Sequence, residues 1–270
     1  MARGYSEDQI RRNIKKLFTT KSHRIYQESI LNYRGKTIDT GTPYSEIIAD
    51  ELTHNYEKLL PLGKSIRIRR TKPFNIGHQG EPNVDARLNR FQKITFSEKL
   101  LAIALYNSKK DFIFGKIFDY QVPMKENRDD EFGEIDLVAL DEHIIKLIEL
   151  KINGTAEETL LRALLEIYTY YKILTGSLEK FVQDYKLTNP KEFIFQPCII
   201  TDSGALSGKT LDTLKDYPCI IKLIYAMQNE INIPIELYTY EYPSHEVTLR
   251  TKNDKHIDLV GNIQFNKIEI

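Results

Sequence analysis

The chain of 270 residues has few of the features that define several common classes of protein. It has two cysteines, Cys198 and Cys219, too few for a disulfide framework or a cysteine-based zinc site, so we expect free thiols. No apolar run approaches the roughly 20 residues that span a bilayer, so we expect no membrane partner. The N-terminal stretch MARGYSEDQIRRNIKK has no apolar core, and we expect no signal peptide and a cytoplasmic location.

Several catalytic signatures are missing as well. The six histidines are scattered without the spacing of a metal-binding pair, and no Gly-x-Ser-x-Gly elbow or Cys/His arrangement is present. Basic and acidic residues number 38 each, so net charge argues neither for nor against nucleic acid. Apolar content of 41% is ordinary for a globular protein, and the length allows one large domain or two small ones.

Charge is nevertheless unevenly distributed, because residues 61–93 are rich in lysine and arginine and contain only Glu81 and Asp85 as acids. Within them, residues 65–70 alternate isoleucine with arginine, as an exposed strand would. One interpretation is a cationic face that grips a phosphate backbone. Its candidate residues are Arg67, Arg69, Arg70, Arg87 and Arg90. The other is a solvated edge strand whose charges deter aggregation.

Hydrophobic periodicity predicts the secondary structure. Helices are expected over residues 6–18, 45–60, 96–107 and 156–174, with helical patterns over 210–229. Strands are expected over residues 112–122, 193–200, 236–242, 246–250 and 257–270, and in a hairpin over 133–151. This order predicts an α/β fold with a mixed central sheet flanked by helices. We divide the chain into an N-terminal accessory region, 1–93, and a main domain, 94–270.

The predicted hairpin, GEIDLVALDEHIIKLIELK, places charged residues on strongly apolar strands. Side chains alternate faces along a strand, so Glu149 and Lys151 share one face, and Asp136 can project beside them from the partner strand. These charges are costly to bury unless they meet each other or a cation, and a divalent metal beside Lys151 would remove that cost. Alternatively, Glu149 and Lys151 form an ion pair on an exposed face, with Asp136 solvated.

The helices on either side of the hairpin also carry charged residues with two interpretations. Thr95 and Glu98 match a capping box, yet Glu98 also follows the apolar stripe and could reach a cation in a cleft. Helix spacing alone favours the cap. Arg162, Glu166 and Tyr170 share one face of the later helix. By spacing alone they are a surface ion pair and a solvent-facing tyrosine.

The order of Asp136, then Glu149-Leu150-Lys151 at the end of the next strand, then a helix, resembles the PD-(D/E)XK nuclease superfamily, which has the restriction-endonuclease-like fold. The resemblance covers about residues 96–200. The chain departs from the family pattern at two positions. Ile135 stands in place of the proline of the motif name, and Glu166 replaces the glutamine that many members have four residues before the tyrosine.

The resemblance implies a Mg²⁺- or Mn²⁺-dependent nuclease that hydrolyses phosphodiester bonds. It implies that Asp136 and Glu149 bind the metal, with the carbonyl oxygen of Leu150 as a further ligand. Such hard cations prefer oxygen ligands. By the same resemblance, Lys151 assists the attack of water on phosphorus, and Glu98 completes the site directly or through water.

Further roles follow from the resemblance for the second helix. Glu166 and Tyr170 would position Lys151 or the phosphate, and Arg162 would contact the phosphate. The glutamate at 166 adds an anion that Arg162 or Lys151 must offset. The implied partner is DNA, with RNA as an alternative, and a homodimer is one option because many members cut two strands as dimers.

Two other functions fit parts of the sequence. One is a nucleic-acid-binding protein that keeps this fold without cleaving. The other is nucleotide binding by residues 203–210, SGALSGKT, which nearly match a phosphate-binding loop. Ser203 stands where that loop requires glycine, and no strand with an aspartate for Mg²⁺ follows. We interpret these residues as a surface loop with a helix cap.

Overall fold

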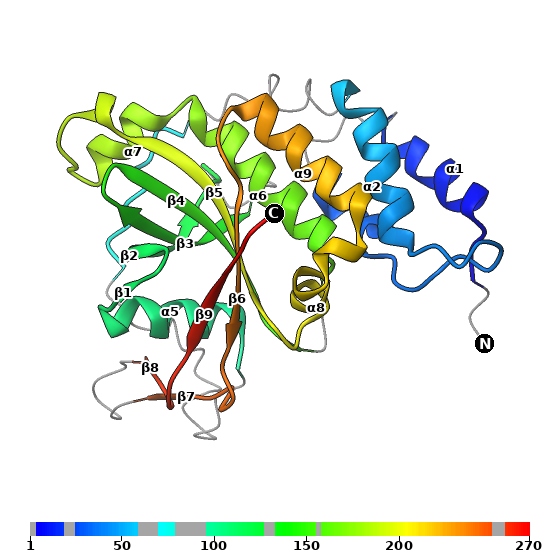
Figure 1. Cartoon of the computed structure of the whole chain (residues 1–270). Helices are drawn as coiled ribbons and strands as arrows, with labels where there is room; N and C mark the ends of the chain where they lie inside the picture. The colour runs from blue at the N-terminus through cyan, green and yellow to red at the C-terminus, as the bar shows by residue number, and fades with distance from the viewer. Residues whose placement is uncertain are drawn as a thin grey trace.

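The computed structural model describes residues 4–18, 25–58, 70–78, 96–126, 133–154, 158–249 and 257–270. As predicted, the fold is α/β, with a mixed seven-stranded sheet flanked by helices (Figure 1). Among the described residues, none of the helices has both the length and the apolar character needed to cross a bilayer.

An antiparallel meander of three strands forms the part of the sheet that carries the site. Its strands are β2 (Gly115–Pro123), β3 (Glu134–Asp141) and β4 (Ile144–Lys151). β3 and β4 form the predicted hairpin, with Leu137 opposite Ile148. The chain turns at Glu142, whose φ of 54° lies in the left-handed region, so the polar break in the sequence is a tight turn.

The remaining strands extend the sheet on both sides. Their bounds are β5 (Ile194–Asp202), β6 (Glu236–Glu241), β1 (Asp111–Phe112) and β9 (Gln264–Ile268). β5 pairs in parallel with β4, β6 pairs in parallel with β5, and the order is β1-β2-β3-β4-β5-β6-β9. β4 and β5 are buried along almost their whole length, because helices cover both faces there.

The two faces of the sheet contribute to separate apolar clusters. Val138, Ile145 and Leu147 pack with α6 (Leu160–Thr175) and α9 (Pro218–Ile231). Their neighbours along the strands pack with α5 (Glu98–Ser108) on the opposite face. The alternation predicted from sequence is therefore present. It places the even-numbered positions of β3 and the odd-numbered positions of β4 on the side of α6.

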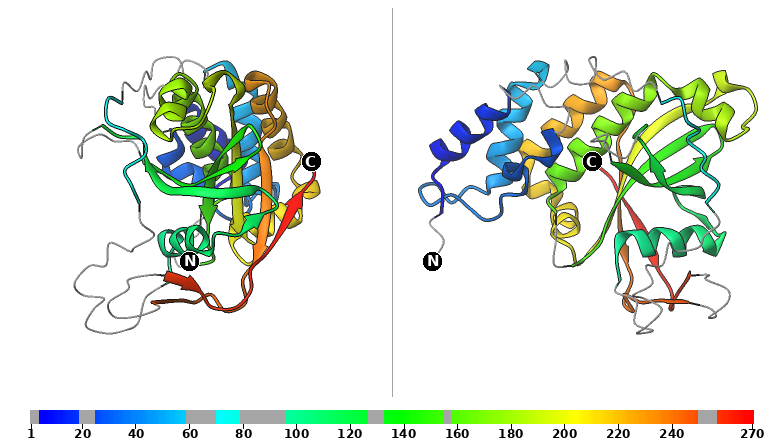
Figure 2. Two further views of the ribbon diagram at one scale, coloured as in Figure 1. Left: turned by 90° about the vertical axis from the view of Figure 1, so that its left-hand side faces the viewer. Right: turned by 180° about the vertical axis from the view of Figure 1, so that it is seen from behind.

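The sheet curls around α5 until its two edge strands approach each other (Figure 2). The ring of Phe265 on β9 lies 5.3 Å from the ring of Phe112 on β1 and 5.1 Å from that of Phe114, between centroids. α5 is thereby enclosed by the strands that it packs against. A small antiparallel pair, β7 (Val247–Leu249) and β8 (Ile257–Leu259), lies next to the same helix.

The N-terminal helix α2 (Tyr44–His54) packs beside α9, and α1 (Glu7–Leu17) packs on the far side of α2, as Figures 1 and 2 both show. Arg11 of α1 joins the two, with its Nη1 2.8 Å from the carboxylate of Asp50. The buried carboxylate of Glu46 on α2 accepts hydrogen bonds from the backbone amides of Cys219 and Ile220, each 3.1 Å long. The N-terminal region therefore shares a core with the rest of the chain.

Several predicted boundaries are wrong, and each for a local reason. The N-cap of α5 is Ser97, whose hydroxyl accepts from the amide of Leu100, so Thr95 is not the capping residue. α6 begins four residues later than predicted because Thr159 caps it. Residues 203–210, expected to be a surface loop, contain the first part of α8 (Leu206–Asp212). α7 (Leu178–Asp184) was not predicted.

Candidate functional site

An open pocket of about 390 Å³ lies where β3 begins, where β4 ends and where α5 and α6 begin. It brings together the predicted site side chains from four separate elements, as the resemblance requires. Those lining it are Glu98, Asp136, Glu149, Lys151, Arg162, Glu166 and Tyr170. In all, six carboxyl groups and three basic groups line the pocket, so its charge is predominantly negative.

Lys151 stands among the carboxylates at the centre of the pocket. Its Nζ lies 2.5 Å from Oε1 of Glu149, 2.8 Å from Oε2 of Glu158 and 3.7 Å from Oε2 of Glu166. Burial alone would lower the pKa of Lys151, but the surrounding carboxylates outweigh it and hold the pKa well above its usual value. Lys151 is therefore a fully charged ammonium at neutral pH.

Asp136 is held in place by both of its carboxylate oxygens. Oδ2 accepts a hydrogen bond of 2.9 Å from the backbone amide of Leu150, and Oδ1 accepts one of 3.0 Å from Nε2 of Gln121. Burial is the largest cause that raises the pKa of Asp136, to about 7, and the nearby carboxylates of Glu98 and Glu166 add to it. Near neutral pH this carboxyl group is therefore only partly deprotonated.

Glu149 has a buried carboxylate oxygen, Oε2, with no hydrogen-bond partner among the described residues. Burial, followed by repulsion from Glu166, raises the pKa of Glu149 well above its usual value despite the ion pair with Lys151. A buried carboxylate oxygen without a partner is costly. The site therefore has a place where a cation would lower the free energy.

Glu98 is the first residue of α5, next to its cap, and not the third residue of a capping box. The backbone amide of Ile152, just beyond the end of β4, hydrogen-bonds to its carboxylate. Burial raises the pKa of Glu98, Lys151 acts in the opposite direction, and repulsion from Glu158 adds to the rise. The capping interpretation is therefore wrong, and Glu98 belongs to the charged cluster around Lys151.

Tyr170 is buried, so its interpretation as a solvent-facing residue is also wrong. Its hydroxyl donates to Oε1 of Glu166 at 2.9 Å, and the hydroxyl of Tyr26, in the single turn Ile25–Gln27, lies 3.5 Å from it. Gly133, at the entry to β3, lets this ring approach closely, because a Cβ there would lie 2.1 Å from the hydroxyl oxygen. Tyr170 and Glu166 thus form a chain that ends at Lys151.

Glu158, Gln121 and Tyr26 contact predicted site side chains and were not expected from the sequence. Glu158 pairs with Lys151 and, through Oε1, with Nε of Arg162 at 2.9 Å. Its spacing of four residues from Arg162 on a helical pattern was the available signal. Gln121 and Tyr26 gave no such signal, since each is brought to the site by tertiary packing.

The donor set of the pocket fits a hard divalent cation such as Mg²⁺ or Mn²⁺. Asp136, Glu149 and Glu98 offer carboxylate oxygens, and Oε2 of Glu149 is buried without a partner. Within the described ranges, no three acidic, histidine or cysteine side chains already stand as ligands around one point. Lys151 is the cation that these carboxylates surround at present, so binding a metal requires their side chains to rotate.

Of the arginines expected to contact nucleic acid, only Arg70 is described. Arg67, Arg69, Arg87 and Arg90, with the rest of the predicted basic strand, lie outside the described residues. Arg70 is buried, and its guanidinium donates to the backbone carbonyls of Lys125 and of Pro73, the latter at 2.8 Å. Arg70 therefore holds residues 70–78 against Lys125, which follows β2 and lines the pocket.

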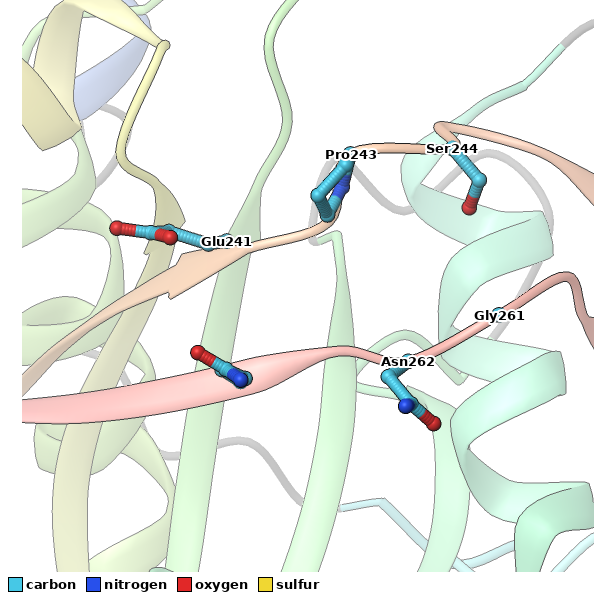
Figure 3. Close-up of a pocket in the computed structure, with 6 residues that line it drawn as sticks. Glu241, Pro243, Ser244, Gly261 and Asn262 are labelled. Carbon is cyan, nitrogen blue, oxygen red and sulfur yellow. The ribbon is translucent and has the colours of Figure 1, made fainter.

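Two other regions of the described chain are a second hollow and the loop that nearly matches a phosphate-binding sequence. A hollow of about 440 Å³ near the ends of β6 and β9 contains one carboxyl group, Glu241, among uncharged residues (Figure 3). At residues 203–210, the amide of Gly204 donates to the carboxylate of Asp202 at 2.7 Å, and His245 pairs with the same carboxylate at 2.8 Å. A loop that holds phosphate needs free amides there, so this arrangement does not favour nucleotide binding.

Comparisons with protein-family models, with curated proteins and with solved structures gave no match. The chemistry of the site therefore rests on its own residues.

Proposed function

We propose that the chain is a metal-dependent nuclease of the PD-(D/E)XK type that hydrolyses phosphodiester bonds in DNA. The observation that supports this function is the convergence of Asp136, Glu149 and Lys151 in one open pocket, on one side of the sheet. The order of α5, the meander β2–β4, α6 and β5 agrees with the order of elements that the resemblance implies.

The residues divide the work of the reaction in a simple way. Asp136 and Glu149 would hold the metal, with Glu98 beside them and the carbonyl of Leu150 within the same strand end. When bound, Mg²⁺ supplies positive charge for the phosphate and lowers the pKa of a water molecule. Lys151, kept charged by its neighbours, donates hydrogen bonds to the attacking water or to the phosphate oxygens that gain negative charge.

Glu166 and Tyr170 are positioning residues in this proposal. Tyr170 donates to one oxygen of Glu166, and the other oxygen lies 3.7 Å from Nζ of Lys151. The glutamate that replaces glutamine thus has its charge directed at Lys151 and not at the phosphate. The positive charge of Lys151 offsets the negative charge that Glu166 adds where many family members have glutamine.

The test compares two buried lysines of the same strand. Lys151→Met removes the proposed catalytic ammonium. Lys146→Met removes a lysine that is also buried and paired, 2.7 Å from Glu236, but that lies outside the pocket. Plasmid DNA, single-stranded DNA and RNA are incubated with each protein in Mg²⁺, Mn²⁺ or chelator. We expect Lys151→Met and Asp136→Asn to lower cleavage by about 100-fold or more, and Lys146→Met to retain it.

The same experiment decides between cleavage and mere binding. Nucleic acid bound by folded wild-type protein, with no cleavage in either metal, would reject the nuclease and favour the non-cleaving alternative. Equal cleavage by wild type and Lys151→Met would also reject it, because a contaminating nuclease then explains the activity. Folding of each variant is checked by circular dichroism and thermal unfolding.

A further inference from the structure

Glu158 links the two basic side chains of the inner pocket. Its Oε2 lies 2.8 Å from Nζ of Lys151, and its Oε1 lies 2.9 Å from Nε of Arg162. The two cations come from different elements, β4 and α6, and the carboxylate bridges them. Neither cation can therefore offer its full charge to another anion while Glu158 stays in this position.

A phosphodiester group makes the same demands as this carboxylate. Each carries one negative charge on two equivalent oxygens, and each is bound in proteins by lysine and arginine. The two cannot occupy the same space, and two such charges a few ångströms apart repel each other. A phosphate that reaches Lys151 and Arg162 must displace Glu158.

We propose that Glu158 is a built-in substitute for the substrate phosphate, which holds the anion position between Lys151 and Arg162 and moves aside when nucleic acid enters. The inference rests on the proposed nuclease function and adds a step to substrate binding. Lys151 and Arg162 form the phosphate subsite, and Glu158 sets its affinity.

The position of Glu158 makes the displacement feasible. It precedes Thr159, the N-cap of α6, so its movement breaks no hydrogen bond of that helix. The side chain of Glu158 is 20% exposed and that of Arg162 is 24% exposed, so solvent reaches part of each, although Oε2 of Glu158 and Nε of Arg162 are buried. The Lys151 side chain is only 7% exposed, so breaking its pair with Glu158 costs free energy, which the charge of the incoming phosphate must replace.

The experiment uses Glu158→Gln, which keeps the shape of the side chain and removes its charge. The matched control is Glu134→Gln, which removes the same charge from the lining of the same pocket, where Glu134 pairs with Lys125 at 3.4 Å. Affinity is measured for a fluorescent single-stranded oligonucleotide in chelator, and for inorganic phosphate as competitor. We expect Glu158→Gln to bind both about fivefold more tightly than Glu134→Gln does.

A second pair of variants assigns the gain to Arg162. Arg162→Ala should change the affinity little in the wild-type background, where Glu158 occupies the guanidinium. In the Glu158→Gln background it should remove most of the gain. Equal affinities of Glu158→Gln and Glu134→Gln would overturn the inference, since only the general charge of the pocket would then matter. So would a loss of cleavage by Glu158→Gln without any gain in binding.

These outcomes are distinct from failure of the proposed function. Absence of cleavage by the wild type rejects the nuclease. The competition by inorganic phosphate still shows whether Glu158 occupies the anion position between Lys151 and Arg162. Cleavage by the wild type without a gain in Glu158→Gln rejects only the role of Glu158.

Discussion

The carboxylate of Asp136 accepts a hydrogen bond of 2.9 Å from the backbone amide of Leu150, which ties β3 to β4 inside the candidate site. The bond favours the charged carboxylate, whereas burial and the neighbouring acids favour the protonated one. The second influence is larger, and the pKa of Asp136 rises to about 7. Charge at this position is therefore sensitive to pH in the neutral range.

The first prediction concerns stability and pH in the presence of chelator. The ordinary pKa of Asp136 is 3.8 and its folded value is about 7, so the folded state binds more protons between these values. Stability should therefore fall as pH rises from about 4 to about 7, by roughly 4 kcal/mol at most from this group. Urea unfolding at a series of pH values measures the slope, which Asp136→Asn should reduce.

Added Mg²⁺ gives the matching control. Metal binding requires deprotonated carboxylates, so Mg²⁺ should stabilise the wild type more at pH 8 than at pH 5.5. A slope left unchanged by Asp136→Asn would show that Asp136 does not carry the effect.

The second prediction concerns the close contact between Gly133 and Tyr170. A Cβ at Gly133 would lie 2.1 Å from the Tyr170 hydroxyl oxygen, a distance that atoms do not tolerate. Gly133→Ala should therefore push Tyr170 away from Glu166, lower the unfolding free energy by about 1–3 kcal/mol and reduce cleavage. Removing the hydroxyl with Tyr170→Phe should restore part of the lost stability in the Gly133→Ala background. If the double variant is as unstable as both losses added together, the contact is not the cause.

The third prediction concerns the cap that α2 provides for α9. Glu46 accepts from the amides of Cys219 and Ile220, which would otherwise be unpaired at the start of α9. Glu46→Ala should lower the unfolding free energy by about 1–3 kcal/mol, and Glu46→Gln by less because one acceptor oxygen remains. Glu57→Ala, at an exposed position beyond α2, is the control. Equal losses in Glu46→Ala and Glu57→Ala would contradict the capping role.

The fourth prediction separates arginines that bind phosphate from an arginine that supports the fold. If Arg87 and Arg90 contact phosphates, their joint replacement by alanine should reduce the slope of log affinity against log salt by about 1.4–1.8. Arg70→Ala should instead lower thermal stability, because Arg70 is buried and donates to two backbone carbonyls. Filter binding of DNA over a range of salt, with melting curves for each variant, measures both. An unchanged slope for the double variant would favour the solvated-edge interpretation.

The alternation of apolar and charged residues was sufficient to predict the β3–β4 hairpin and the charged side chains that cluster on it. Alternation along two short strands placed Glu149 and Lys151 on one face, with Asp136 beside them, and the structure confirms this placement. The helix face of Glu166 and Tyr170 followed from the period of 3.6 residues. These features depend on neighbours within a few residues, which is why sequence alone defines them.

Contacts between segments that are far apart in the sequence could not be predicted from local patterns. Tyr26 meets Tyr170 across 144 positions, and Glu46 caps α9 across more than 170. Serine and threonine are both favoured N-cap residues, so the local pattern did not distinguish Ser97, the observed cap of α5, from Thr95. The environment of Tyr170 on α6 likewise depends on the approach of Gly133, which directly precedes β3.

The ring of Phe265 packs against the rings of Phe112 and Phe114, and we call these contacts between the two edges of the sheet the aromatic seam. The seam affects the position of Glu98. α5 lies inside the curl that this seam closes, and Glu98 is its first residue. Loosening these rings would let the helix shift within its enclosure and carry one acidic group of the pocket out of alignment. It would also uncover two strand edges able to pair with another molecule, so the same aromatic rings hold the candidate site in register and keep the sheet edges from pairing with other chains.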